Sequence, residues 1–114
     1  MLLDWTSKLR SLRPFNRKCK LQVSGGVSRP PMERSAGVAA LYKKAALIAQ
    51  ELGWRLREAA VGGGSDGNFT AGLGIPTLDG LGGVGDGAHA VHEFISISEL
   101  PRRTALLAGL IESV

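Results

Sequence analysis

Two short segments of the chain carry residue types that could bind or transform a ligand. The first, residues 62–68, is a glycine-rich run that contains one serine and one aspartate. Glycines let backbone N–H groups approach an anion closely, and a following helix N-terminus adds positive potential. The run lacks the Gly-Lys-Ser/Thr of a P-loop and does not open a long helix as a dinucleotide site does. It predicts either a strand-to-helix turn capped by Ser65 or Asp66, or a loop that holds a carboxylate or oxyanion.

The second segment, residues 87–93, holds two histidines and a carboxylate: His89, His92 and Glu93. Neutral imidazole is a good zinc ligand, but a zinc ion takes three or four protein ligands. The spacing H-x-x-H-E matches neither the H-E-x-x-H nor the H-x-x-E-H motif of metallopeptidases. We therefore expect this segment to contribute a ligand to a metal site that is completed elsewhere.

Arg29 is the third candidate, because it precedes Pro30 and Pro31 and so lies on a stiff, extended segment. A guanidinium held in this way is suited to bidentate recognition of a carboxylate, although a plain surface arginine has the same sequence. Nucleophilic catalysis by serine is not indicated, since the run Gly63-Gly64-Ser65-Asp66-Gly67 approaches the motif G-x-S-x-G only superficially and no triad accompanies it. Cys19 lies among lysines with no histidine nearby, which favours a structural thiol.

Four helices and three short strands would position these residues. Apolar spacings of three and four predict helices over residues 2–12 and 36–52, the second with Ser35 as N-cap and Gly53 after its end. A short helix is expected over residues 66–71, and a last helix begins near Ser98. The core face of that last helix is expected to consist of Leu106, Leu107, Leu110 and Ile111.

Alternating or buried apolar runs predict strands over residues 19–23, 54–61 and 75–78, with His89 in a loop. The order of elements is typical of the α/β class. These few short strands cannot cover the apolar faces of the long helices. A larger mixed or parallel sheet is therefore implied, and the chain looks incomplete.

Composition bounds the class of protein. With 114 residues the chain forms one domain at most, and no window resembles a transmembrane helix or a secretory signal. A single cysteine excludes a disulfide framework, so a reducing cytoplasm is the expected compartment. Residues 1–57 carry 12 Lys/Arg and three Asp/Glu, a balance of +9, whereas residues 58–114 carry −5. Because no nucleic-acid motif or aromatic platform accompanies the basic half, we expect neither a nucleic-acid nor a membrane partner.

Taken together, three motifs closely resemble the C-terminal part of one enzyme family. They are GGGSDGNF at residues 62–69, GIPTLDGLG at 74–82 and GAHA at 87–90. The family is that of the co-catalytic zinc metallopeptidases, which includes glutamate carboxypeptidase, acetylornithine deacetylase and succinyl-diaminopimelate desuccinylase. The Arg29 segment and the helix that ends at Gly53 fit the glutamate carboxypeptidase branch best.

The resemblance implies a role for each segment. Residues 1–26 would be a helix–strand remnant of a lid or dimerisation domain, and residues 27–114 the C-terminal part of an α/β catalytic domain. His89 matches the last zinc ligand, Gly64 and Ser65 match a substrate-contacting loop, and Arg29 matches an arginine that binds the substrate carboxylate. The implied substrate is a small acyl-amino-acid or peptide, cleaved beside its C-terminal carboxylate with zinc as cofactor.

The same resemblance implies that this chain is inactive alone. The family's H-x-D motif, its bridging aspartate and its Glu-Glu pair with the general base are absent from the sequence. We therefore expect a truncated or split-gene product. Two other functions stay open: a non-catalytic interaction module that forms a homo-oligomer through the strand edge at residues 18–24, and, less favoured, a nucleic-acid-binding module.

Overall fold

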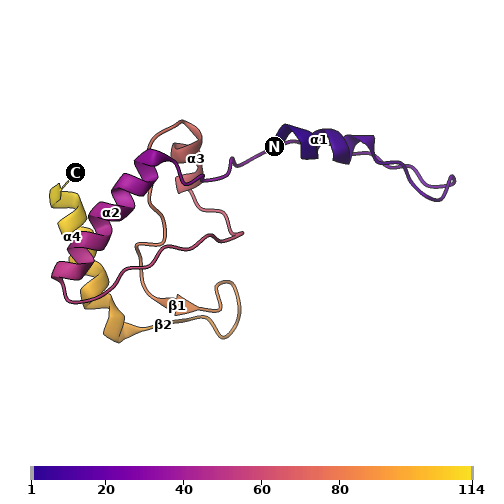
Figure 1. Cartoon of the computed structure of the whole chain (residues 1–114). Helices are drawn as coiled ribbons and strands as arrows, with labels where there is room; N and C mark the ends of the chain where they lie inside the picture. The colour runs from indigo at the N-terminus through magenta and orange to yellow at the C-terminus, as the bar shows by residue number, and fades with distance from the viewer. Residues whose placement is uncertain (1, 114) are drawn as a thin grey trace.

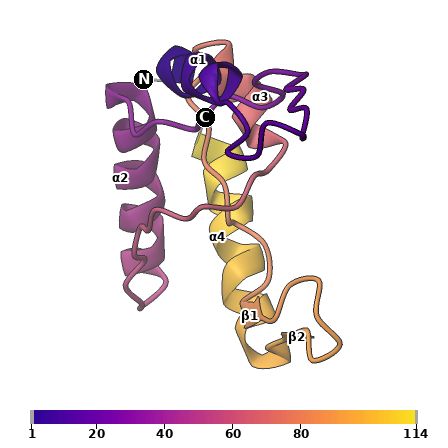
Figure 2. The same cartoon turned by 90° about the vertical axis from the view of Figure 1, so that its right-hand side faces the viewer.

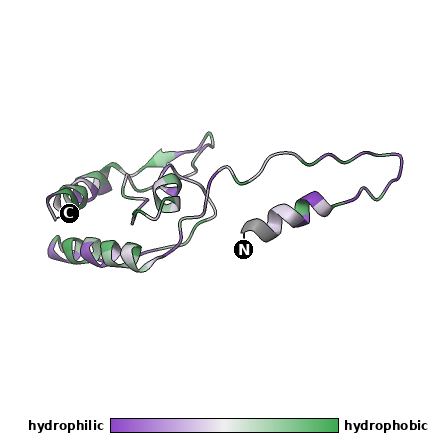
Figure 3. Ribbon diagram, turned by 90° about the horizontal axis from the view of Figure 1, so that it is seen from above, coloured by the Kyte–Doolittle hydropathy of each residue, from purple (hydrophilic) through white to green (hydrophobic). Residues whose placement is uncertain are grey.

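The structure is a computed structural model that describes residues 2–113. It consists of an N-terminal arm and a C-terminal body (Figure 1). In the arm, the chain leaves helix α1 (Leu2–Ser11), turns and runs back beside it, and Arg10 donates a hydrogen bond of 2.8 Å to the Gly25 carbonyl oxygen. The arm extends away from the body in two perpendicular views (Figures 1 and 3). The helix predicted over residues 2–12 is confirmed.

Two long helices form the framework of the body, α2 (Ala36–Glu51) and α4 (Leu100–Ser113) (Figure 2). As predicted, Ser35 caps α2, its hydroxyl oxygen accepting from the Val38 N–H at 3.2 Å. Gly53 follows the helix with a φ of +84°, a left-handed backbone that glycine adopts without strain. In the middle of α4, Gly109 allows close packing of the two helices, because a Cβ there would lie 2.9 Å from the Ile48 Cγ2.

The buried core is small and lies between these two helices. Among the described residues it consists of Ala45, Ala49, Leu106 and Leu110. The predicted core face of α4 is therefore half right: Leu106 and Leu110 are buried, whereas Leu107 is 41% and Ile111 67% exposed. A helix packed on a single neighbour buries one narrow stripe, and the rest of an apolar face needs a second neighbour to cover it.

The short helix and the strands complete the body. Helix α3 (Gly67–Gly72) lies one residue later than predicted. Strand β1 (Gly85–Asp86) pairs antiparallel with β2 (Phe94–Ile95), Gly85 opposite Ile95, and a 3₁₀ turn η1 (Ile97–Glu99) leads into α4. This mixture of helices and a small sheet is compatible with the α/β class.

The strands predicted over residues 19–23, 54–61 and 75–78 are wrong for the described chain, in which the sheet consists of β1 and β2, whereas the larger mixed or parallel sheet implied for the complete domain stays a prediction. A strand exists only where a neighbouring backbone accepts and donates its hydrogen bonds, and these three segments have no such neighbour. The alternation of apolar and polar residues is nevertheless seen in the burial of residues 54–57. Trp54 and Leu56 pack against the core, whereas Arg55 and Arg57 are exposed.

The chain has an unusually large surface for its size. Its accessible area is 9312 Å², against about 6,000 Å² for a compact monomer of this mass. Its radius of gyration is 19.4 Å, against about 13 Å for a compact domain of similar length. Exposed apolar side chains contribute to this surface, among them Leu73, Val61 and Val91. Apolar surface on this scale is typical of a face that another polypeptide covers.

The predicted division into residues 1–26 and 27–114 stays a prediction, and its outer ends, Met1 and Val114, lie outside the described residues. Across residues 2–113, none of the helices has the length and apolar character needed to span a bilayer.

Acid should weaken the contact between the start of α2 and the segment after it. Arg34 Nε donates to Glu58 Oε2 at 2.9 Å and Nη2 donates to Oε1 at 3.0 Å. This pairing lowers the pKa of Glu58. A carboxyl whose pKa is lower in the folded state stabilises the fold above its unfolded pKa, and that contribution is lost as the pH falls through the folded value.

We therefore expect the free energy of unfolding of the wild-type chain to exceed that of Glu58→Gln by a small amount near neutral pH. The gap should close below about pH 4.3, the ordinary pKa of a glutamate. Chemical denaturation at a series of pH values measures it. A gap that is constant with pH would show that the ion pair does not stabilise the fold.

Candidate functional site

The structure brings Arg29 against the glycine-rich loop, although 35 residues or more separate them in sequence. Its Nη2 lies 3.4 Å from the Asp66 Oδ1, and its guanidinium carbon lies 5.0 Å from the centre of the Phe69 ring. Gly64 accommodates this approach without any adjustment, because a Cβ there would lie 3.2 Å from the Arg29 Cδ and 3.3 Å from its Nη1. Three of the four predicted site residues, Arg29, Gly64 and Ser65, thus belong to one cluster.

Hydrogen bonds within the loop fix its shape and occupy some of its donors. The Ser65 N–H donates to Asn68 Oδ1 at 2.7 Å, and the Ser65 hydroxyl oxygen accepts from the Gly67 N–H at 3.0 Å. This reciprocal pattern resembles a capping box at the start of α3, so Ser65 rather than Asp66 serves as the cap. The predicted anion cradle is therefore only partly free. The Ser65 amide is engaged, whereas the hydroxyl proton of Ser65 makes no bond within the described residues.

Asn68 connects the loop to the arginine segment, a role that sequence reasoning missed. While its Oδ1 accepts from Ser65, its Nδ2 donates to the Pro30 carbonyl oxygen at 2.8 Å. A Cβ on Gly67 would also meet the side chain of Met32, at 2.8 Å, so the two segments are in close contact. The only available signal was the spacing of Ser65 and Asn68, which matches the first and last positions of a capping box. Contact with Pro30 had no local signal.

His89 lies apart from this cluster, in the loop between β1 and β2. It is exposed and has a φ of +67°, the one left-handed non-glycine residue that the structure describes. Such backbone costs of order 1–3 kcal/mol and is concentrated at functional sites. The loop before α3 and the β1–β2 loop both project away from the helix pair (Figure 1). Within residues 2–113, no hydrogen bond or ion pair joins them.

In the described part of the chain, no group of three or more His, Cys, Asp or Glu side chains is arranged as a ligand set. His89 is exposed. The His92 ring lies close to Gly87, because a Cβ on Gly87 would be only 2.8 Å from the His92 Cδ2. Structural and catalytic zinc sites need at least three protein ligands. A zinc ion bound by His89 would therefore need further ligands that the described residues do not gather around it.

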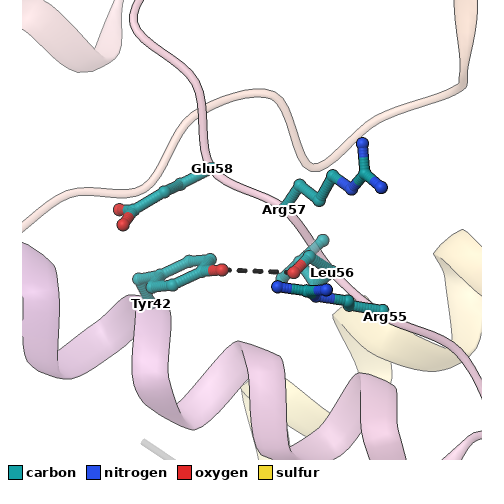
Figure 4. Close-up of a pocket in the computed structure, with 5 residues that line it drawn as sticks. All are labelled: Tyr42, Arg55, Leu56, Arg57 and Glu58. Carbon is teal, nitrogen blue, oxygen red and sulfur yellow. Dashed lines mark hydrogen bonds between the residues drawn. The ribbon is translucent and has the colours of Figure 1, made fainter.

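Two open hollows lie away from these residues. One of about 300 Å³ is lined by Tyr42 and the segment from Arg55 to Glu58, where the Tyr42 hydroxyl donates to the Leu56 carbonyl oxygen at 3.1 Å (Figure 4). A second, of about 260 Å³, lies between α1 and the returning chain of the arm. Neither includes Arg29, Ser65 or His89, so the clustering of charged and polar groups defines the candidate site better than concavity does.

Comparison with known proteins shows the family to which the chain belongs. The model of peptidase family M20/M25/M40 matches residues 14–113, which is most of the chain, and the chain belongs to this family. Its members are hydrolases of the metallopeptidase type and are generally metal-dependent. No curated protein and no solved structure matches the chain. The family resemblance noted in the sequence is thus confirmed, and the particular branch is a matter for proposal.

Replacing Asn68 tests the link between the loop and the arginine segment. In Asn68→Asp the carboxylate keeps the bond from the Ser65 N–H, but it places an oxygen against the Pro30 carbonyl oxygen. We expect a loss of stability of about 1–3 kcal/mol, the usual cost of an unsatisfied polar pair. Chemical denaturation measures it. Thr70→Ser is the control, because it changes a residue of the same helix but keeps the hydroxyl that makes the hydrogen bonds of Thr70. Equal stability of the two variants would contradict a stabilising bond between Asn68 and Pro30.

Proposed function

We propose that this chain supplies the substrate-binding loop and one metal ligand to a zinc-dependent hydrolase of the glutamate carboxypeptidase type. The hydrolase cleaves an amide or peptide bond beside a C-terminal carboxylate. In this proposal Arg29 binds the substrate carboxylate, Gly64 and Ser65 contact the substrate near the scissile bond, and His89 is a zinc ligand. The chain is inactive alone, because the remaining ligands and the general base come from polypeptide outside it.

One observation carries this proposal: the approach of Arg29 to the loop of Gly64 and Ser65. A guanidinium with several unused N–H groups and a serine hydroxyl with a free proton lie on neighbouring segments. Together they offer a fork of donors for a carboxylate and a further donor beside it. Membership of peptidase family M20/M25/M40 supports the reaction class, and the strained backbone of His89 supports its role as a ligand.

The proposed lid remnant rests on the shape of the arm. Within the remnant proposed over residues 1–26, Arg10 donates a hydrogen bond to the Gly25 carbonyl oxygen, and the described part of this segment projects from the body (Figure 1). The segment over residues 19–23 is exposed and lacks a paired strand, as an edge removed from its sheet would be.

Complementation tests the function. The purified chain is mixed or fused with the upstream half of another family member that carries the H-x-D motif and the Glu-Glu pair. We expect hydrolysis of an N-acyl-glutamate that requires both halves and stops when zinc is removed. The upstream half alone and the fusion carrying Ser65→Ala are the controls. A well-folded complex without any hydrolysis would contradict the proposal.

A second function, homo-oligomerisation through the arm, is favoured by the exposed Leu21 and Val23 on its unpaired segment, 49% and 38% exposed. Light scattering over a range of protein concentrations tests it. We expect a mass that rises with concentration and that returns to the monomer in the variant Leu21→Lys. A strict monomer at the highest concentration would eliminate this function.

A further inference from the structure

Asp66 has no structural role that accounts for its place beside Arg29. Its side chain is 96% exposed and makes no capping bond at the start of α3, where Ser65 and Asn68 provide the caps. Within the described residues, its carboxylate forms a hydrogen bond or ion pair with Arg29 alone. The carboxylate is therefore held in position by the arginine, and not by the fold around it.

Arg29, in contrast, is fixed by contacts that do not involve Asp66. Its side chain is 39% exposed, packs against Gly64 and stacks on the ring of Phe69 at 5.0 Å. Stacking of this kind holds the guanidinium plane but leaves its edge free for hydrogen bonds. A single contact of 3.4 Å to one carboxylate oxygen uses little of that edge. An exposed pair with this geometry is weak and is readily exchanged for a better one.

From these contacts we propose that Asp66 is a resident carboxylate that occupies Arg29 in the ligand-free chain and competes with the carboxylate of the ligand. A ligand carboxylate that binds the free edge through two N–H groups displaces Asp66, which then swings into solvent. Asp66 thus makes binding selective: a ligand must form a bidentate carboxylate contact with Arg29 to displace Asp66, and amides or esters do not displace it. This inference deepens the proposed function and rests on its assignment of Arg29 as the carboxylate-binding residue.

Titration of the full chain with N-acetylglutamate tests this competition without metal or turnover. The NMR signal of the Arg29 Nε–H group reports binding, and Arg29→Ala identifies that signal. We expect Asp66→Asn to bind N-acetylglutamate about two- to fivefold more tightly than the wild type, the range that corresponds to an exposed ion pair. N-acetylglutamine, which keeps only the α-carboxylate, serves to distinguish the two carboxylates of the probe.

The matched control is Asp79→Asn, which removes the same charge from an exposed aspartate that has no hydrogen bond or ion pair among the described residues. It should leave the affinity unchanged, so that a general change in net charge is separated from a local effect. Phe69→Leu should weaken binding in both the wild type and Asp66→Asn, since it removes the stacking that fixes the guanidinium.

Three results would overturn the inference. They are an affinity of Asp66→Asn no tighter than that of the wild type, an equal gain in Asp79→Asn, and the absence of any Arg29-dependent signal change in the wild type and Asp66→Asn alike. These outcomes are separate from failure of the proposed function. Tighter binding in Asp66→Asn without hydrolysis after complementation would leave the competition intact and remove the hydrolase. Hydrolysis after complementation, with no effect of Asp66→Asn on affinity, would support the hydrolase and remove the competition by Asp66.

Discussion

Replacing Leu106 with alanine is expected to lower the free energy of unfolding by about 2–5 kcal/mol, the usual cost of deleting a buried leucine. Leu106 is the largest fully buried side chain, and with Leu110 it forms the α4 half of the core. The facing residues, Ala45 and Ala49, are too small to fill the space. A loss of this size is a large part of the stability of any small domain, so separation of α2 from α4 is expected. Thermal or urea unfolding followed by circular dichroism measures it.

The neighbouring residue provides a matched control. Leu107 lies on the same helix, has the same side chain and is 41% exposed. We expect Leu107→Ala to cost clearly less than Leu106→Ala, because the Leu107 side chain is less buried and so loses less apolar burial. Should Leu107→Ala prove equally damaging, the outer face of α4 would be buried in the protein in solution, and the packing described above would be incomplete.

Removal of the Arg29 guanidinium is expected to have the largest effect on the reconstituted hydrolase. Hydrogen bonds to a charged group are worth about 1.5–3 kcal/mol, and partial exposure of Arg29 places the expected loss near the lower limit. We therefore expect kcat/KM for an N-acyl-glutamate to fall about tenfold or more in Arg29→Ala. Because the contact is to a part of the substrate that does not react, the change should be mainly in KM.

Arg29→Lys separates charge from geometry. Lysine keeps the positive charge but lacks the planar fork and the stacking on Phe69, so it should recover only part of the loss. Full recovery by lysine would show that charge alone matters there. A variant Arg55→Ala, which removes an exposed arginine from the hollow beside Tyr42, should leave kcat/KM unchanged.

Elements set by local sequence were predictable, and those set by distant partners were not. Helix α2 has its cap, its apolar stripe and its terminal glycine within 19 residues, and all three were found in the sequence. The segment over residues 54–61 has the alternation of a strand, and yet no strand forms, because nothing in the described chain pairs with it. The two-residue strands β1 and β2 had no signal at all, since a pair so short leaves no periodicity.

The candidate site divides in the same way. The resemblance of short motifs predicts Arg29, Gly64, Ser65 and His89 as site residues, and their roles stay a prediction, whereas membership of peptidase family M20/M25/M40 is confirmed. What the sequence could not supply was how these residues meet. The stacking of Arg29 on Phe69 and the bridge from Asn68 to Pro30 join segments 38 to 40 residues apart. Contacts at that separation depend on the packing of α3 and are invisible in any local pattern.

The zinc content of the chain, alone and after complementation with the upstream half, tests whether this chain supplies one ligand to a zinc site that another polypeptide completes. The comparison includes His89→Asn, in which asparagine tolerates the left-handed backbone but removes the imidazole, and His92→Ala as the control from the same loop. We expect substoichiometric zinc in the chain alone, full occupancy in the complemented wild type and His92→Ala, and a clear loss in His89→Asn. Full zinc occupancy in the chain alone, or complemented His89→Asn that keeps all its zinc, would contradict the account.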